Sequence, residues 1–280
     1  MRSLLIIMLA FFVFSINGAE KKDVKLFILS GQSNAAGAGN GDLLPDKYKL
    51  KNNEILLFQG NKWHKMAPYK RTAEKFNIDS IAFGAELSFA YELKDRYPNH
   101  IIAISKVAIR GGTSIVAWDK DNERDDWIED LKEVGNENKA KFKLYDQLIS
   151  DTKKSIELLR EREDVDEINL SGMLWLQTER DGHKLATIRK YEPRLIDFIY
   201  NIRTDLDVPE LPFFVMDAHI VRRPYLEQQQ AMLRRVSDKI NNVHIIKCED
   251  LPTHEGVHFN TKGQIELGKL FAHSYIMNYD

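Results

Sequence analysis

The chain has 280 residues, of which 43% are hydrophobic and 29% are charged, and its formal net charge is −2. This composition is typical of a globular protein, and the length suits one large domain or two small ones. A charge so close to zero provides no long-range attraction for nucleic acid or for an anionic membrane, so we expect neither as a partner.

The first 19 residues have the pattern of a secretory signal peptide. Arg2 supplies a positive start, residues 4–14 form an apolar core, and small residues up to Ala19 suit cleavage. The apolar stretch is too short to span a bilayer comfortably, although an uncleaved N-terminal anchor is an alternative. We therefore expect residues 20–280 to form a single domain that is secreted or periplasmic and has no membrane attachment after cleavage.

The most informative stretch comes next, at residues 26–37, LFILSGQSNAAG. An apolar run predicts a buried strand, a polar turn follows, and Ala35 and Ala36 begin a helix. Ser33 in this turn would lie at the carboxyl edge of a parallel sheet, where open α/β sheets bind ligands. It is therefore a candidate nucleophile, and the alternative is that it only caps the helix.

Five apolar runs along the chain alternate with segments of helical periodicity. This alternation predicts a five-stranded parallel sheet with helices on both faces. The predicted strands cover residues 24–29, 101–107, 168–176, 213–216 and 243–246. The only cysteine, Cys248, lies just after the last strand, so no intrachain disulfide can form and the thiol is expected to be packed in the core.

The segments between these strands are expected to be helices and loops. Residues 40–69 form a polar loop with at most one short strand, near residues 54–58, and residues 118–138 form a charged surface excursion. Asp79 and Ser80 are expected to start the first long helix, and Thr261 is expected to start the last one with a capping box. The helices between them are centred on residues 148–159, 185–203 and 225–240.

Polar turns follow several of these strands and would share one edge of the sheet. His258 lies three residues after Glu255, a spacing that can bring carboxylate and imidazole together within one turn. Glu255 would then orient His258, and His258 would take the proton from Ser33. Asp250 is an alternative orienting acid. The alternative bases are His254 and, further away in sequence, His64, His183 and His219.

Donors for an oxyanion are also available at this edge. The backbone N–H groups of Ser33 and Gly112 and the side-chain amide of Gln177 could point at one oxygen. Gln32 and Asn34, which flank the serine, are expected to contact the substrate. Trp118, beyond the glycine turn, could stack on a sugar or cover the helix behind it. Three charged residues after Gln177, and one in the first long helix, are expected to be structural: Glu179, Arg180, Asp181 and Glu86.

Four segments of the sequence, in order, resemble the four blocks of the GDSL/SGNH hydrolase superfamily. They are FILSGQSNAAG, AIRGGTSI, LWLQTERDG and EGVHFNTKGQ, and together they span residues 26–264. They are most similar to the carbohydrate-esterase branch of the sialate O-acetylesterase and acetylxylan esterase type (carbohydrate esterase family six).

The resemblance implies a three-layer α/β/α, flavodoxin-like fold and a serine esterase without metal or other cofactor. It further implies that the substrate is an acetylated carbohydrate, such as acetylated xylan or sialic acid. Ser33 takes the place of the nucleophile, His258 that of the base, Gly112 that of an oxyanion donor, and Gln177 that of an asparagine donor found in other members.

Two positions depart from the family pattern. The third block usually reads Gln-Gly-Glu-Ser-Asp, whereas here Thr178 stands in place of glycine, and the acid before the histidine is usually Asp but here is Glu255. These departures leave two other functions open. One is a protein of this fold that binds acetylated glycans with a weak or inactive site, and the other is a non-carbohydrate acyl esterase or lipase of the same superfamily.

Overall fold

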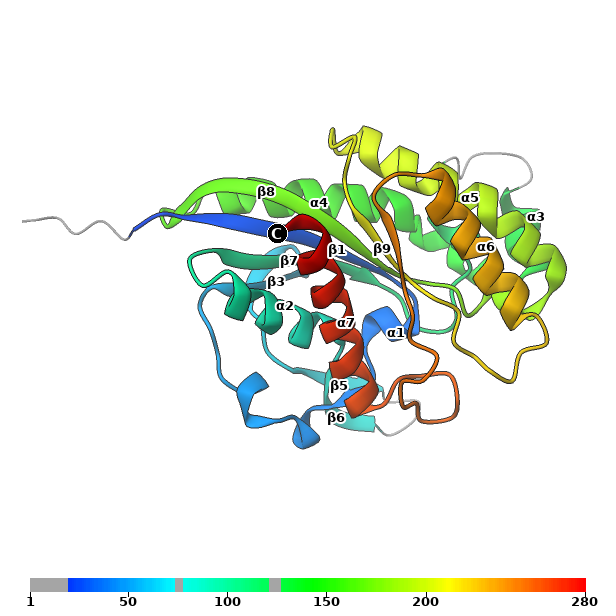
Figure 1. The fold of residues 1–280 in the computed structure, drawn as a ribbon, viewed down its shortest axis with the longest axis horizontal. Helices are drawn as coiled ribbons and strands as arrows, with labels where there is room; N and C mark the ends of the chain where they lie inside the picture. Colours follow the sequence, from blue (N-terminus) through cyan, green and yellow to red (C-terminus); the bar gives the residue numbers. More distant parts are fainter. Residues whose placement is uncertain (1–19, 74–77, 121–126) are drawn as a thin grey trace, which may run out of the picture.

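The computed structural model describes residues 20–73, 78–120 and 127–280, so the predicted signal peptide lies outside the described residues. A mixed α/β fold surrounds a central sheet of seven strands (Figure 1). Six of the strands are parallel, and β4 at one edge runs antiparallel to β3. The strands, in sheet order, are β10 (Val243–Ile246), β9 (Phe213–Met216), β8 (Val165–Leu176), β1 (Lys22–Gly31), β7 (Ile101–Ala108), β3 (Ile55–Gln59) and β4 (Lys62–Lys65).

The five predicted strands are all present, but the predicted count of five is wrong. The sheet continues beyond β7 because the polar loop contains the hairpin β3–β4, whose first strand, Ile55–Gln59, has four buried residues. Segments at either end of this loop form a small second sheet of three strands. These are β2 (Gly39–Asn40), β6 (Ile78–Phe83) and β5 (Tyr69–Ala73).

The order of the five predicted strands fixes where a ligand can bind. From one side to the other they run β7, β1, β8, β9 and β10. Numbered along the chain, these five strands have the order 2-1-3-4-5 of flavodoxin-like sheets. In this order the second strand lies on one side of the first strand, and the later strands lie on its other side. The carboxyl end of β1, and hence the turn that contains Ser33, is therefore the switch point of the sheet, where a crevice is expected.

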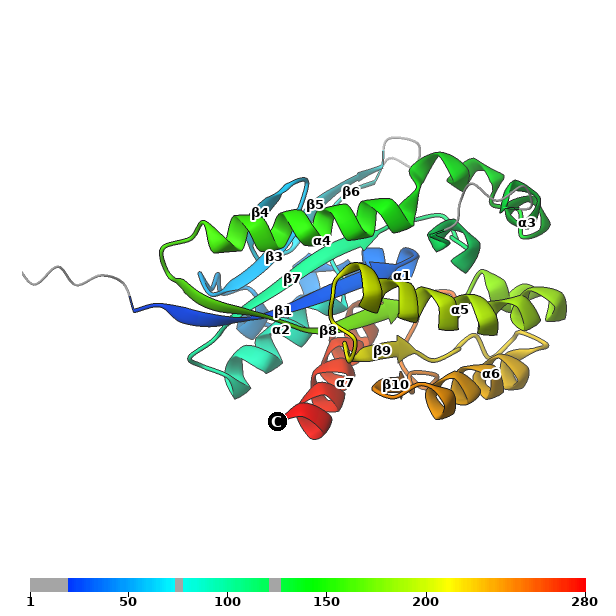
Figure 2. The same cartoon turned by 90° about the horizontal axis from the view of Figure 1, so that it is seen from above.

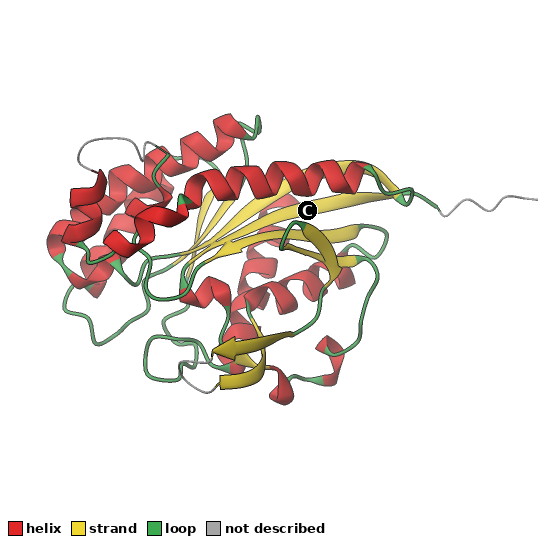
Figure 3. Ribbon diagram, turned by 180° about the vertical axis from the view of Figure 1, so that it is seen from behind, coloured by secondary structure: helices red, strands yellow, loops and turns green. Residues whose placement is uncertain are grey.

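Helices cover both faces of the sheet (Figures 1 and 2). Successive residues of β1 point to opposite faces, so Phe27 packs with α2 and α7 while Ile28 packs with α4, α5 and α6. Figure 3 shows the long helix α4 along the face that α5 and α6 also cover. The long helices are α2 (Ala85–Arg96), α4 (Leu144–Arg160), α5 (Leu185–Asp205), α6 (Leu226–Lys239) and α7 (Thr261–Tyr279), and the short ones are α1 (Ser33–Ala36) and α3 (Trp127–Glu133).

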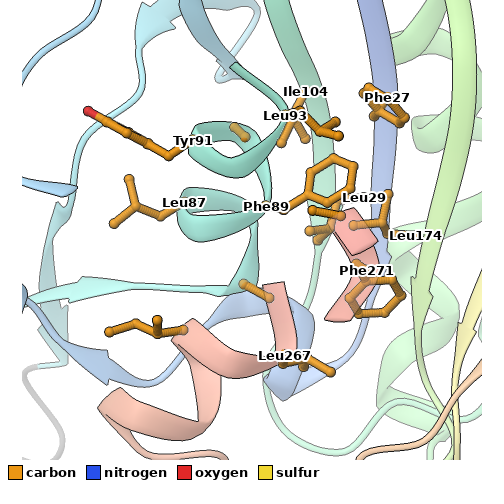
Figure 4. Packing of buried hydrophobic residues seen from close by; sticks show 14 of the residues in the cluster. Phe27, Leu29, Leu87, Phe89, Tyr91, Leu93, Ile104, Leu174, Leu267 and Phe271 are labelled. Atoms are coloured by element: carbon orange, nitrogen blue, oxygen red, sulfur yellow. The ribbon is translucent and has the colours of Figure 1, made fainter. Parts of the chain in front are cut away.

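On the face of the sheet covered by α2 and α7, aromatic side chains pack together near the site. Phe27 and Leu29 of β1 lie against Phe89 of α2 and Phe271 of α7 (Figure 4). The rings of Phe27 and Phe89 meet edge to face with their centroids 4.9 Å apart. This core fixes β1 between the two helices, and with it the turn that follows β1.

Two predicted helix starts are displaced. Asp79 and Ser80 lie in strand β6 and not in a helix, because the helix begins only after Gly84, at Ala85. The last helix does begin at Thr261, but its cap is Asn260, whose side chain accepts a hydrogen bond from Gly263 N–H at 3.0 Å. The capping interaction therefore starts one residue earlier than predicted.

Candidate active site

The turn that contains Ser33 is shaped by the glycine at the end of β1. Gly31 has φ +138°, and a Cβ atom there would lie 2.1 Å from the carbonyl oxygen of Leu176 in β8. Gln32 N–H donates to that same oxygen at 3.1 Å, and Ile109 N–H donates to Gly31 O at 3.1 Å. The end of β1 is thus tied to both neighbouring strands, and Ser33 begins α1 directly above the sheet edge.

Ser33, His258 and Glu255 form one hydrogen-bonded chain. His258 Nε2 lies 3.0 Å from Ser33 Oγ, and His258 Nδ1 contacts a carboxylate oxygen of Glu255. Burial raises the pKa of the Glu255 carboxyl, but the hydrogen bond and the charge of His258 outweigh it and leave that pKa below its ordinary value. This is the order of groups that activates a serine hydroxyl: nucleophile, base and orienting acid.

Asn34 holds the loop that contains His258 in place through hydrogen bonds and does not line the cavity next to Ser33. Its side-chain amide donates to Glu179 Oε1 at 2.6 Å and to Val257 O at 3.1 Å, and its Oδ1 accepts from Phe259 N–H at 3.1 Å. The residue is fully buried. Its predicted role in substrate binding is therefore wrong, since every side-chain polar atom is used to hold protein groups.

The rival histidines and the rival acid are placed elsewhere. His219 is buried, stacks on Phe259 with ring centroids 4.5 Å apart, and binds Val257 O through Nε2 at 2.8 Å. His64 is on the edge strand β4, where Nε2 binds Gln59 O. His254 and His183 line the cavity but do not contact Ser33, and Asp250 is exposed with no described contact to His258.

The glycine turn lies beside the serine. Gly111 and Gly112 have φ +91° and +66°, a left-handed conformation that favours glycine, and both line the cavity with Ser33. No described group accepts a hydrogen bond from Gly112 N–H. Ser33 N–H is at the first position of α1, where no intrahelical partner exists. These two N–H groups are the available oxyanion donors.

Gln177 is not an oxyanion donor in this structure. Both hydrogens of its side-chain amide are used, since Nε2 donates to Thr113 O at 2.6 Å and to Asp181 Oδ2 at 2.7 Å. The side chain is fully buried and does not line the cavity. Its hydrogen bonds connect the end of β8 to the residue that follows the glycine turn, within the protein interior.

The charged residues after Gln177 have structural contacts. Asp181 accepts hydrogen bonds from Ser114 Oγ at 2.6 Å and from Ile115 N–H at 3.1 Å. Burial raises the pKa of the Asp181 carboxyl, and these hydrogen bonds oppose the rise only in part. Glu179 accepts from Asn34 and from Thr178 N–H, so its carboxylate is satisfied within the protein.

Trp118 does not face a substrate. Its side chain is fully buried and packs edge to face on Trp175 of β8, with ring centroids 5.3 Å apart. The alternative that it covers the protein interior is the one that the structure supports. Cys248 is buried as predicted, and burial raises the pKa of its thiol well above the ordinary value.

The cavity above Ser33 has a volume of about 570 Å³ and is lined mainly by polar and charged residues. Gln32 lines it, as predicted for a substrate contact. Three arginines also lie in its wall, Arg110, Arg180 and Arg223. Of these, only Arg180 was considered in the sequence, where a structural role was favoured over substrate contact. Arg110 lies two residues after β7, and Arg180 lies in the turn after β8, so their positions after parallel strands were the available signal.

The arginines differ in how far the protein satisfies them. Arg110 donates to Gly37 O and to the Tyr69 hydroxyl, the latter at 3.1 Å. Arg180 donates to two main-chain oxygens near the end of α3. For Arg223, the buried Nη1 has no hydrogen-bond partner, and burial lowers the pKa of its guanidinium. Within the described residues, Arg223 is therefore the least engaged of the three guanidinium groups.

Within residues 20–73, 78–120 and 127–280, no three histidine, cysteine or carboxylate side chains gather in a way that could hold a metal ion. The helices in the same ranges are too short or too polar to cross a membrane.

Comparisons with known proteins identify the family of the chain. A family model described as carbohydrate esterase, sialic acid-specific acetylesterase, matches residues 23–277. The chain belongs to this family of carbohydrate esterases. Over 274 residues it is 23% identical to a probable carbohydrate esterase of Arabidopsis thaliana, and the alignment covers 91% of each chain.

Solved structures show the same fold at low sequence identity. A protein from Arabidopsis thaliana aligns with a TM-score of 0.70 at 22% identity, over 93% of this chain and all of that one. NanS aligns with a TM-score of 0.65 at 14% identity, over 92% and 98%. A carbohydrate acetylesterase from Xanthomonas citri aligns with a TM-score of 0.61 at 16% identity, over 89% of this chain and 55% of that one.

Proposed function

We propose that this carbohydrate esterase is a secreted serine esterase of the SGNH/GDSL superfamily that removes O-acetyl groups from carbohydrates. The observation that carries the proposal is the chain of contacts from Ser33 Oγ through the ring of His258 to Glu255, at the mouth of a polar cavity. Family membership supports the carbohydrate substrate, and residues 1–19 support secretion.

The reaction would proceed in two acyl-transfer steps. His258 Nε2 takes the proton from Ser33 Oγ as that oxygen attacks the acetyl carbonyl carbon, and Glu255 stabilises the resulting imidazolium. The bond to the sugar oxygen then breaks, and His258 returns the proton to the leaving sugar. Water, deprotonated by the same histidine, then attacks the acetyl-serine, the bond to Ser33 Oγ breaks as His258 returns the proton to that oxygen, and acetate is released.

Charge on the carbonyl oxygen would be stabilised by backbone donors alone. Ser33 N–H and Gly112 N–H are free, whereas the Gln177 amide is not. Each donor of this kind lowers the barrier by about 3–4 kcal/mol. Two donors therefore suffice for a working site, and the replacement of glycine by Thr178 does not remove either of them.

The cavity wall favours an anionic sugar, such as O-acetylated sialic acid, over neutral acetylated xylan. Three guanidinium groups line it, those of Arg110, Arg180 and Arg223. The two carboxylates in the wall, Glu179 and Glu255, are engaged by Asn34 and His258. A guanidinium binds a carboxylate strongly when both are shielded from water. The polar lining also disfavours a long acyl chain.

Acetate release from a panel of acetylated glycans tests the proposal. The wild type is expected to release acetate and Ser33→Ala to release none, while a series of p-nitrophenyl esters should show preference for acetate over long chains. Arg223→Gln should raise KM for acetylated sialic acid and leave KM for acetylated xylan unchanged. Release at equal rates by wild type and Ser33→Ala would refute a serine mechanism, and no release by either would favour a glycan-binding protein. Preference for long acyl chains would favour a lipase-like esterase.

Secretion has a separate test. The full-length chain produced in a bacterium is expected to be found outside the cytoplasm with its N-terminus at or near Glu20. Intact protein that stays in the cytoplasmic or membrane fraction would refute this part of the proposal.

A further inference from the structure

Two side chains of one segment, residues 136–139, donate hydrogen bonds to the main chain on both sides of the Gly111-Gly112 turn. Lys139 Nζ donates to the carbonyl oxygen of Arg110 at 2.9 Å, and Asn136 Nδ2 donates to the carbonyl oxygen of Gly112 at 2.9 Å. Asn136 Oδ1 also accepts a hydrogen bond from Ser114 N–H. The peptide between Gly111 and Gly112 therefore lies between two carbonyl groups whose directions are fixed from outside the turn.

That peptide carries the Gly112 N–H, which the proposed function uses as an oxyanion donor. Two consecutive glycines have the largest conformational freedom that a chain can have, and Gly111 is exposed. Left alone, such a turn would sample several orientations of its N–H groups. A donor aimed at a developing charge contributes only when its direction is fixed before the reaction.

The segment that contains Asn136 and Lys139 is itself held in place by hydrogen bonds and packing. Asn136 N–H donates to Leu131 O of α3 at 2.7 Å, and Lys139 N–H donates to Asn136 O at 2.7 Å, at the start of the 3-10 helix Glu137–Phe142. Trp127 of α3 is buried, and its indole N–H donates to Val116 O at 3.1 Å. The charged excursion predicted to be only a surface feature thus packs against the site.

Burial separates these two residues from their neighbours on the same segment. Asn136 and Lys139 are 2% and 8% exposed, whereas Asn138 and Lys141 are exposed. The hydrogen bond of Lys139 goes to a main-chain carbonyl and to no carboxylate among the described residues. A mostly buried ammonium group without a carboxylate partner is costly for stability, and its described partners are the carbonyl oxygen of Arg110 in the turn and the ring of Phe142, whose centroid is 5.6 Å away.

We infer that Asn136 and Lys139 are positioning residues, which act through the backbone of the glycine turn to aim Gly112 N–H at the oxyanion. The inference rests on the proposed esterase function. It assigns a role in catalysis to the segment that follows α3, which contacts neither Ser33 nor His258.

The test compares Asn136→Ala and Lys139→Met with the matched exposed variants Asn138→Ala and Lys141→Met. With p-nitrophenyl acetate, each buried variant is expected to lose at least about tenfold in kcat, since complete loss of one donor costs about 10²- to 10³-fold. KM should change little, and the pH profile of kcat should keep its shape because His258 and Glu255 are untouched. The exposed variants should behave as wild type.

A second readout separates aiming of the donor from a general loss of structure. Methylboronic acid forms a tetrahedral adduct with a serine nucleophile and places an oxygen where the oxyanion develops, whereas acetate is planar. Inhibition by methylboronic acid should weaken in the buried variants about as much as kcat/KM falls, while inhibition by acetate should stay as in wild type. If Asn136→Ala does not fold, Lys139→Met decides, because the Met side chain fills most of the lysine's volume.

Wild-type kcat in the folded buried variants, or an equal loss in the exposed variants, would overturn the inference. So would equal weakening of methylboronic acid and acetate. Ser33→Ala, measured in the same assay, distinguishes failure of this inference from failure of the proposed function. An active Ser33→Ala refutes the proposed function, whereas an inactive Ser33→Ala beside fully active Asn136 and Lys139 variants refutes only the inference.

Discussion

The proposed nucleophile and the proposed base of the site are held in opposite ways. Ser33 is 6% exposed and sits in a turn tied to the central strands. His258 and Glu255, by contrast, lie in a loop, and their side chains are 36% and 53% exposed. The serine is therefore positioned by the sheet and its core, whereas the histidine is positioned by a few backbone hydrogen bonds within its loop and by contacts from neighbouring side chains. Substitutions around the serine should mainly reduce stability, and those around the histidine should mainly reduce activity.

A buried ion pair lies beside the nucleophile turn. Lys106 Nζ is 2.7 Å from Glu86 Oε1, and both side chains are 3% exposed. Lys106 also approaches Ala36 O, at the end of α1, at 3.5 Å. Glu86 thus supports the sheet edge, as the sequence predicted.

The largest effect on stability is expected for Lys106→Met, which leaves the buried Glu86 carboxylate without its cationic partner. We expect the free energy of unfolding to fall by about 3–5 kcal/mol in chemical denaturation. The exposed pair of Lys154 and Glu157 provides the control, and Lys154→Met should change stability by less than about 1 kcal/mol. Equal effects of the two substitutions would show that the nucleophile side does not depend on buried charge.

Asn34→Ala should affect both sides, because Asn34 joins the serine turn to the histidine loop. Glu179 and Phe259 N–H each lose a partner, so stability should fall by about 1–3 kcal/mol. Displacement of His258 should lower kcat on the order of 100-fold. Asn53→Ala in an exposed loop is the control, and an unchanged kcat in Asn34→Ala would mean that the loop keeps its place without this tie.

Glu255→Gln should separate activity from stability most clearly. Loss of the carboxylate that orients the base should reduce kcat at least about 100-fold. Because the pair is exposed, the free energy of unfolding should change by less than about 1 kcal/mol. Asp250→Asn is the matched variant, and a loss of kcat in that variant in place of Glu255→Gln would make Asp250 the orienting acid.

The smallest effect concerns pH. The folded-state pKa of Glu255 lies below its ordinary value of 4.5, so its ionised form is favoured in the folded protein. The resulting stabilisation is present above about pH 4.5 and disappears as the pH falls through the lower folded-state pKa. The difference in Tm between wild type and Glu255→Gln should therefore shrink toward zero in acid, and a difference that stays constant down to pH 3 would contradict this assignment.

The same contrast explains what the sequence could predict. Ser33 follows a strongly apolar strand, and Glu255 and His258 are three residues apart, so local patterns were enough to bring these groups to one edge. The alternation of apolar and helical segments likewise predicts a parallel sheet, but alternation alone does not fix the strand order 2-1-3-4-5. In the hairpin β3–β4, the short strand predicted near residues 54–58 corresponds to β3, whereas β4 was not predicted because its residues are mostly polar and exposed.

The direction in which a polar side chain points could not be predicted in this way. Gln177 and Asn34 lie in the predicted turns, yet both point into the protein to satisfy buried groups. Trp118 packs on Trp175 for the same reason that apolar surface is buried anywhere. Position after a strand therefore predicts closeness to the site, whereas exposure to the cavity depends on tertiary contacts that the sequence pattern does not contain.

Covalent capture of the nucleophile tests the central claim most directly. Wild-type protein treated with a phosphonofluoridate should gain one phosphonyl group by intact mass and lose its esterase activity in proportion. Peptide mapping should place the group on Ser33, and His258→Ala should react far more slowly. A fully inactivated enzyme whose adduct lies on another residue, or an active enzyme that forms no adduct at all, would contradict the assignment of Ser33 as the nucleophile.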